Sequence, residues 1–162
     1  MICPEKNQIE IRMNAYAKVT IHNIHPICRI KKKEIEKLIN RVLKSEGMSL
    51  PVDVIFVDDD FMEKINRKFT RRRKTTDVLS FGMKEGVNMG VDYPSLGDIY
   101  VSLDQAKRQA QEYRISLKEE TSRLTVHGLL HLLGYDHKSK KEAKIMKEKE
   151  EAYLNWSASP KT

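Results

Sequence analysis

The sequence predicts an α/β (α+β) fold: a single compact domain with a small mixed four-stranded sheet and about five helices. First, a chain of 162 residues suits one domain, which can bury roughly 70 % of its unfolded surface and build a core. Second, four short strand-like segments come early, with helical patterns between them and throughout the C-terminal part. Third, no internal repeat and no Gly/Ser- or Pro-rich linker divides the chain, so we expect residues 1–162 to form one domain.

The first half of the chain predicts two strands and two helices. Alternating apolar and polar residues predict a strand over 17–22, and a β-branched run opened by proline predicts another over 51–57. Between them, apolar residues at helical spacing predict an amphipathic helix over 33–45, which Gly47 ends. Asp59 or Asp60 can then cap a short helix.

The second half predicts two strands followed by three helices. The strands are expected at 77–81 and 98–101, and the glycine-containing loop between them is a candidate rim for a site. The helices are expected at 103–113, 116–134 and 140–153. Ser116 and Glu119 fit a capping box at the start of the second helix, and Gly134 fits its end.

Composition excludes several classes of protein. With 40 % hydrophobic and 33 % charged residues, the chain resembles neither a membrane-spanning protein nor a disordered tail. The N-terminus lacks the basic-then-apolar pattern of a secretory signal. Cys3 and Cys28 are too few for a disulfide framework, which favours a reducing cytoplasm as the location.

Three histidines, His127, His131 and His137, fall within an eleven-residue window. His127 and His131 are four residues apart in a predicted helix, so both imidazoles leave the same face. Gly134 permits a turn with positive φ that would return His137 to the pair, and Gly128 is expected to leave room beside an ion. Since buried imidazoles need partners, the pattern predicts three ligands for a divalent cation such as zinc, with one position open to water.

The histidine spacing also matches that of the metzincin peptidases, in which glutamate follows the first histidine as the general base. Here that position is Gly128, and Asp136 is the nearest alternative carboxylate. The absent glutamate argues against peptidase chemistry.

A basic segment is the second concentration of functional residues. Six of the eight residues in 67–74 are Lys or Arg, which leaves 24 basic against 23 acidic residues elsewhere in the chain. The formal net charge of +7 is therefore mostly local. A solvated charge run is the ordinary interpretation, but arginines beside an open metal site suit a phosphodiester substrate.

Together these motifs resemble the YbeY endoribonucleases, the bacterial rRNA maturation factors. The resemblance covers about 52–153, with the window from His127 to His137 as its most specific part. The strand motif of residues 76–81, the run from Gly97 to Tyr100 and the position of Asn66 also match.

This resemblance implies a metal-dependent hydrolase in which His127, His131 and His137 hold one divalent ion, most simply zinc, with nickel or another transition metal as alternatives. It implies cleavage of single-stranded RNA in 16S rRNA 3′-end maturation and ribosome quality control. The implied partner is rRNA in the small ribosomal subunit, with no role for DNA or a membrane.

One catalytic residue does not carry over in register. The family pattern places an arginine four residues after the asparagine, where this chain has Thr70. The nearest candidate for holding the phosphate is Arg71, one residue later, with Arg72 and Arg73 as alternatives.

Two other functions compete with the endoribonuclease. One is a non-catalytic RNA-binding ribosome assembly factor with a structural metal, which requires a fourth protein ligand, with Asp136 the nearest candidate. The other is a metallopeptidase, which ranks last because of Gly128.

Overall fold

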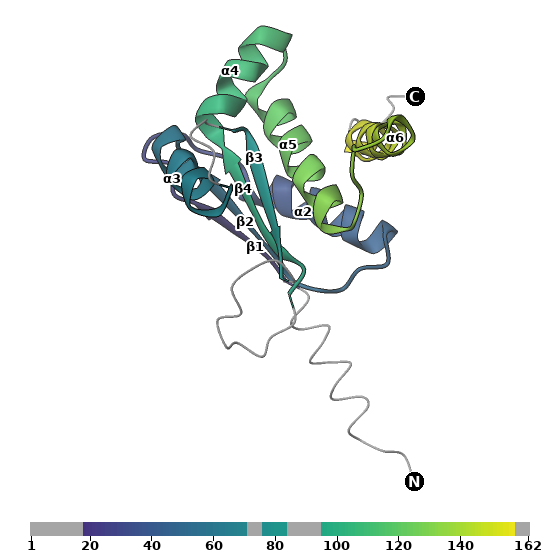
Figure 1. Ribbon diagram of the computed structural model, residues 1–162. Helices are drawn as coiled ribbons and strands as arrows, with labels where there is room; N and C mark the ends of the chain where they lie inside the picture. The colour runs from purple at the N-terminus through teal and green to yellow at the C-terminus, as the bar shows by residue number, and fades with distance from the viewer. Residues whose placement is uncertain (1–17, 71–75, 84–94, 158–162) are drawn as a thin grey trace.

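The computed structural model describes residues 18–70, 76–83 and 95–157 (Figure 1). The described residues form four strands and five helices, in the following order: β1 (Val19–Asn23), α2 (Lys32–Ser45), β2 (Val52–Val57), α3 (Asp59–Thr70), β3 (Val78–Gly82), β4 (Gly97–Ser102), α4 (Leu103–Tyr113), α5 (Leu117–Leu132) and α6 (Lys140–Ser157). The predicted α/β class is confirmed, and every predicted strand and helix is present. The extension of the domain over the whole of 1–162 remains a prediction.

The sheet has the strand order β1-β2-β4-β3 and is mixed. β1 pairs with β2 in parallel, and β2 pairs with β4 in parallel, with Val52 opposite Gly97. β3 runs antiparallel to β4 and forms one edge. Parallel neighbours need a crossover connection, and the chain between β1 and β2 forms α2. The chain between β2 and β4 forms α3 and then the edge strand β3.

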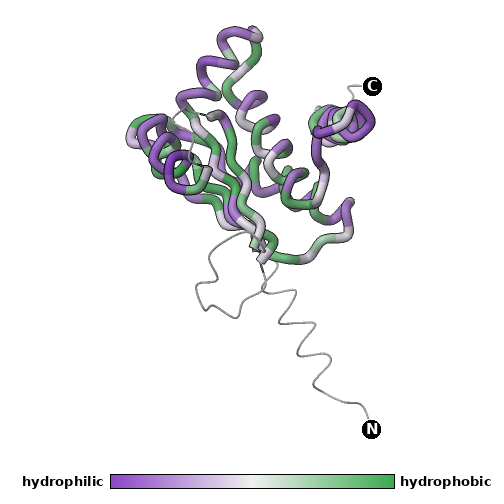
Figure 2. The backbone as a smooth tube through the Cα atoms, in the orientation of Figure 1, coloured by the Kyte–Doolittle hydropathy of each residue, from purple (hydrophilic) through white to green (hydrophobic). Residues whose placement is uncertain are grey.

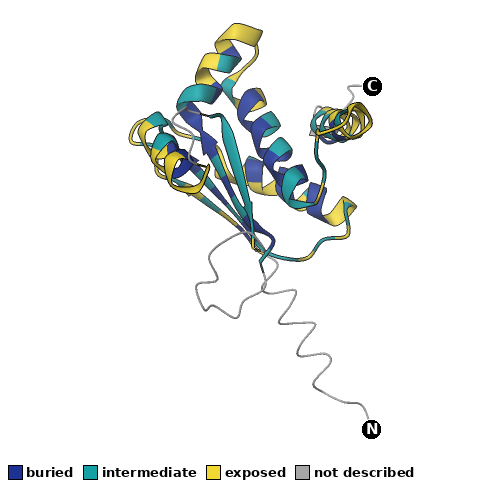
Figure 3. Ribbon diagram, viewed as in Figure 1, coloured by how far each residue is buried: buried dark blue, intermediate teal, exposed yellow. Residues whose placement is uncertain are grey.

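Helices cover both faces of this sheet. In Figure 1, α3 lies against one face, α2 and α5 lie on the other, and α6 lies outside α5. Alternate residues of β2 and β4 are buried on the α2/α5 side, among them Val54, Phe56, Ile99 and Val101. The hydrophobic residues gather between the sheet and α5, whereas the outer turns of α3, α4 and α6 are hydrophilic and exposed (Figures 2 and 3).

The boundaries of the C-terminal helices differ slightly from those predicted. α5 begins with the expected capping box: the Glu119 N–H donates to Ser116 Oγ at 3.0 Å, and the Ser116 N–H donates to Glu119 Oε2 at 3.1 Å. It ends at Leu132, two residues before Gly134. α6 continues to Ser157, four residues further than predicted, because no glycine or proline interrupts the chain there. In the described part of the chain, no helix is both long and apolar enough to span a bilayer.

Candidate metal centre

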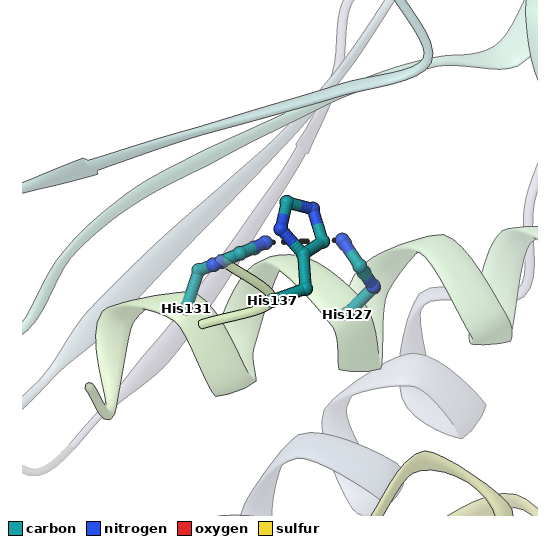
Figure 4. Close-up of side chains that lie close together, drawn as sticks. All are labelled: His127, His131 and His137. Atoms are coloured by element: carbon teal, nitrogen blue, oxygen red, sulfur yellow. Dashed lines mark hydrogen bonds between the residues drawn. The ribbon is translucent and has the colours of Figure 1, made fainter. Parts of the chain in front are cut away.

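The end of α5 brings the three histidines together. His127 and His131 lie one turn apart on this helix. Gly134 follows with φ of +101°, a conformation that L side chains rarely adopt. The N–H groups of Gly134 and Tyr135 donate to the carbonyls of His131 and Leu130 at 3.1 and 3.0 Å, a Schellman motif. This turn reverses the chain so that His137 faces the two helical histidines, as the sequence predicts (Figure 4).

The geometry of the three imidazoles suits one metal ion. One nitrogen from each ring lies within 4.8 Å of the others, and among the described residues these three form the group able to hold an ion. His127 Nε2 and His131 Nε2 are 3.1 Å apart. Two nitrogens bound at about 2.0–2.1 Å to a tetrahedral zinc ion lie about 3.3 Å apart. Small adjustments of the ring torsions would therefore fit a divalent ion among them.

The surroundings of His131 favour its neutral imidazole, the form that binds metals. Burial lowers the pKa of His131, and the neighbouring His127 and His137 lower it further, outweighing the opposing effect of Asp136. Exposure increases along the cluster: the side chain of His127 is 24 % exposed and that of His137 is 58 % exposed. The ion would therefore be held at the helix and open to solvent on the His137 side.

A cleft of about 870 Å³ opens beside the cluster. The histidines and the turn from Gly134 to His137 form one wall, and the edge strand β3 with the residues just before it forms another. Pockets that bind small ligands have volumes of about 300–1,000 Å³, so a nucleotide-sized group can enter. The predicted loop lies partly outside the described residues, but Gly82, Ser95 and Leu96, which flank it, line the cleft.

Gly128 has a packing role that the sequence did not predict. A Cβ atom at this position would lie 2.7 Å from Cγ2 of Ile99 and 3.0 Å from Oγ of Ser80. Ser80 also donates a hydrogen bond to the Gly128 carbonyl at 2.8 Å. Residue 128 therefore faces the sheet, and Gly128 allows α5 to contact β3 and β4 rather than leaving room beside an ion. Gly128 carries no carboxylate, so the peptidase interpretation lacks its general base.

Two glutamates outside the motif support the cluster. Glu150 of α6 is hydrogen-bonded to Nδ1 of His127. Glu46, at the end of α2, accepts hydrogen bonds from Tyr135 at 2.9 Å, from Lys149 at 3.1 Å and from Tyr153. Neither glutamate is singled out by the sequence, because many acidic residues share these helices. One signal was available for Glu150, since it lies at helical spacing between Met146 and Tyr153, both buried.

The remaining predicted site residues lie either outside the three-histidine group or outside the described residues. Asp136 is outside the three-histidine group, and its carboxylate accepts the His137 N–H at 2.8 Å. Arg71 and its alternatives, 72 and 73, lie outside the described residues. Thr70 ends α3, and its hydroxyl donates to the Asn66 carbonyl at 2.7 Å.

The other two histidines lie away from the cluster. His22 is exposed on β1. His25 accepts the Cys28 N–H at 2.9 Å, and its other ring nitrogen lies 2.8 Å from Asp104. These contacts connect the end of β1 to α4, a structural role.

The fold and the cluster define a class: a single α/β domain whose helix end presents three imidazoles for one metal ion, the donor set of many metal-dependent hydrolases. The sequence profile described as "Endoribonuclease YbeY" matches residues 19–157. The chain therefore belongs to the YbeY endoribonuclease family; it is a hydrolase that acts on RNA.

Similarity to individual proteins supports this family assignment. An "Endoribonuclease YbeY" of Pelotomaculum thermopropionicum is 45 % identical over 124 residues, covering 74 % of this chain and 82 % of its own. The "Endoribonuclease YbeY" of Aquifex aeolicus is 40 % identical over 129 residues, which cover 78 % of this chain and 84 % of its own. A solution structure from Thermotoga maritima matches with a TM-score of 0.62 and 27 % identity, over 88 % of this chain and 94 % of that one.

Proposed function

We propose that this protein cleaves single-stranded RNA with one divalent metal ion held by His127, His131 and His137, and that it matures the 3′ end of 16S rRNA and acts in ribosome quality control. The observation that supports this most is the three-imidazole cluster, open to solvent at His137 and set in the cleft beside β3. Zinc is the first candidate, with nickel or another transition metal as alternatives. The substrate in the cell would be rRNA in the small ribosomal subunit.

Each part of the site would have its own role in the reaction. When bound, the ion supplies Lewis acidity toward a phosphoryl oxygen and lowers the pKa of water. His127 and His131 orient the ion from the rigid helix, and His137 completes the set from the turn. β3 and the residues before it form the opposite wall, where a single strand would lie. Arg71 remains the proposed partner of the scissile phosphate, because a guanidinium matches phosphate oxygens with two parallel hydrogen bonds.

The open donor set argues against a purely structural metal. Structural zinc sites normally have four protein ligands. Among the described residues, the group that could hold an ion has three members, and Asp136 is not one of them. The non-catalytic assembly factor therefore lacks the fourth ligand that it requires in this part of the chain. The family membership also favours an enzyme.

The test is cleavage of a labelled single-stranded RNA by wild type, His131→Ala and His22→Ala, each with and without chelator. His22 is the matched control, since it is exposed and lies outside the cluster. We expect wild type and H22A to cleave, and both chelator and H131A to reduce the rate by at least about 100-fold, because the ion is needed for the reaction. Equal cleavage in all samples would reject the proposal.

A second measurement addresses the substrate. A 16S rRNA fragment with an extended 3′ end would be offered alone and within small subunits, beside a duplex RNA and a single-stranded DNA of the same sequence. We expect cleavage near the mature 3′ end and none of the duplex or the DNA. Unselective cleavage of all four would contradict the role in rRNA maturation.

A further inference from the structure

One imidazole of the cluster has both nitrogens engaged from opposite sides. Nδ1 of His127 is hydrogen-bonded to Glu150 Oε1, and Nε2 of His127 lies 3.1 Å from Nε2 of His131. A neutral imidazole carries one N–H, and an ionised carboxylate can only accept. The hydrogen of His127 therefore lies on Nδ1, and the lone pair on Nε2 points to the other histidines.

This contact is not an incidental surface pair. The side chain of Glu150 is 15 % exposed and that of His127 is 24 % exposed. On α6, Met146 and Tyr153 lie about one turn to either side of Glu150, and both are buried in the core. Figure 1 shows α6, seen nearly end-on, on the side of α5 that faces away from the sheet. The carboxylate is therefore fixed by a packed helix and not by a free side chain, unlike the usual surface ion pair.

The positive charge of Arg123 lies near this contact. Arg123 lies one turn before His127 on α5, and its Nε and Nη2 are hydrogen-bonded to the fully buried carboxylate of Glu120. The hydrogen bond from Arg123 to Glu120 raises the pKa of the guanidinium, and the charge of Glu150 raises it further. Arg123 therefore places a fixed positive charge near Glu150.

We propose that Glu150 is a positioning residue for the metal centre: it fixes the tautomer and the ring orientation of His127 so that Nε2 is presented to the ion. Carboxylates that accept the second N–H of a ligating histidine commonly hold metal sites in this way. This inference rests on the proposed metal-binding function. It also assigns α6 to the site, although the histidine motif ends before that helix begins.

Glu150 does not act as a general base. Its carboxylate lies on the Nδ1 side of the His127 ring, whereas the ligand nitrogens converge on the Nε2 side. The ring therefore separates Glu150 from the position of the ion. Its contribution is to the geometry and affinity of the site.

The experiment compares Glu150→Ala, Glu150→Gln and the matched control Glu148→Ala. Glu148 is exposed on the same helix, so E148A removes the same charge without touching the histidine. Affinity for Zn²⁺ would be measured by competition with a chromophoric chelator. The ring tautomer of His127 would be read in the metal-free proteins from long-range ¹H–¹⁵N NMR correlations of the histidine side chains.

We expect E150A to bind Zn²⁺ about 10- to 100-fold more weakly than wild type, with E148A unchanged. E150Q should lose less, because its amide oxygen can still accept the Nδ1 hydrogen. His127 should be the Nδ1–H tautomer in wild type and E150Q, and lose that preference in E150A. If E150A does not fold, the tautomer of His127 in the wild-type protein decides, and an Nε2–H tautomer there would overturn the inference.

Two results would overturn the inference while leaving the proposed function intact. One is wild-type affinity in E150A. The other is an equal loss in E150A and E150Q with an unchanged tautomer, which would show that only the charge of Glu150 matters. A wild-type protein that binds no divalent ion would instead reject the proposed function, and this inference with it.

Discussion

At the scale of single residues, Gly128 determines how closely α5 approaches the sheet. Any Cβ at this position would meet side chains from two strands, Ile99 of β4 and both Val78 and Ser80 of β3. These contacts lie one residue from His127, so Gly128 also sets the distance between the three-histidine cluster and the cleft wall on β3.

We expect Gly128→Ala to destabilise the fold by about 1–2 kcal/mol, because overpacking outweighs the better helix propensity of alanine. The free energy of unfolding from urea denaturation is the measurement. Gly82→Ala is the matched control, since a Cβ at Gly82 has no atom within 4 Å. G82A should change stability by less than about 0.5 kcal/mol. Equal stability of G128A and wild type would show that α5 can move away from the sheet at no cost.

Single residues also show how far the sequence could predict the site. The three histidines could be recognised because they lie within eleven residues and their geometry follows from one helix and one glycine turn. Glu150 and Glu46 could not, because they reach the site across 23 and 89 residues of chain. Helical periodicity places a residue on a face but does not say which other element that face contacts.

At the scale of elements, Glu46 joins α2 to α6 and to the turn before His137. Tyr135 in the turn and Lys149 and Tyr153 on α6 all donate to its carboxylate, which is 14 % exposed. Burial raises the pKa of Glu46, but the hydrogen bonds from Tyr153, Lys149 and Tyr135 together outweigh burial and leave the pKa below its ordinary value.

We therefore expect Glu46→Gln to lower the free energy of unfolding by about 1–3 kcal/mol near neutral pH. Because the folded pKa of Glu46 is lower than the unfolded one, its stabilisation is complete above the unfolded value of about 4.3 and is lost as the pH falls through the folded pKa. The difference between wild type and E46Q should shrink accordingly in denaturation series from pH 7 to pH 3.

Glu36→Gln provides the control for this series, since Glu36 is exposed on the same helix. It should match wild type at each pH within about 0.5 kcal/mol. A constant difference between wild type and E46Q across the series would contradict the titration of Glu46 as its cause.

The elements were predicted more completely than their order in space. Alternation and helical spacing are local, so each strand and helix was found to within a few residues. The order β1-β2-β4-β3 was not predicted, because it depends on pairing between residues such as Val52 and Gly97, far apart in the sequence. Hydrophobic patterning determines which face of a strand is buried but not which strand lies beside it.

At the scale of the whole molecule, a bound ion should stabilise the fold. A ligand present at 100 times its dissociation constant adds up to about 2.7 kcal/mol. For a domain of this size, that corresponds to a rise in Tm of about 5–10 °C. Thermal denaturation of the metal-free protein with and without added Zn²⁺ measures it. The rise should disappear in H131A and be reversed by chelator; an unchanged wild-type Tm would contradict tighter binding to the native state than to the unfolded state.

The close spacing of the three histidines in the sequence has a thermodynamic consequence. Since His127, His131 and His137 lie so close along the chain, the unfolded protein keeps them near one another and can also bind Zn²⁺, which reduces the stabilisation of the native state. The rise in Tm should therefore be smaller than the native affinity alone implies. The affinity of a peptide spanning 124–140, compared with that of the folded protein, would measure what the rest of the folded domain adds to the site.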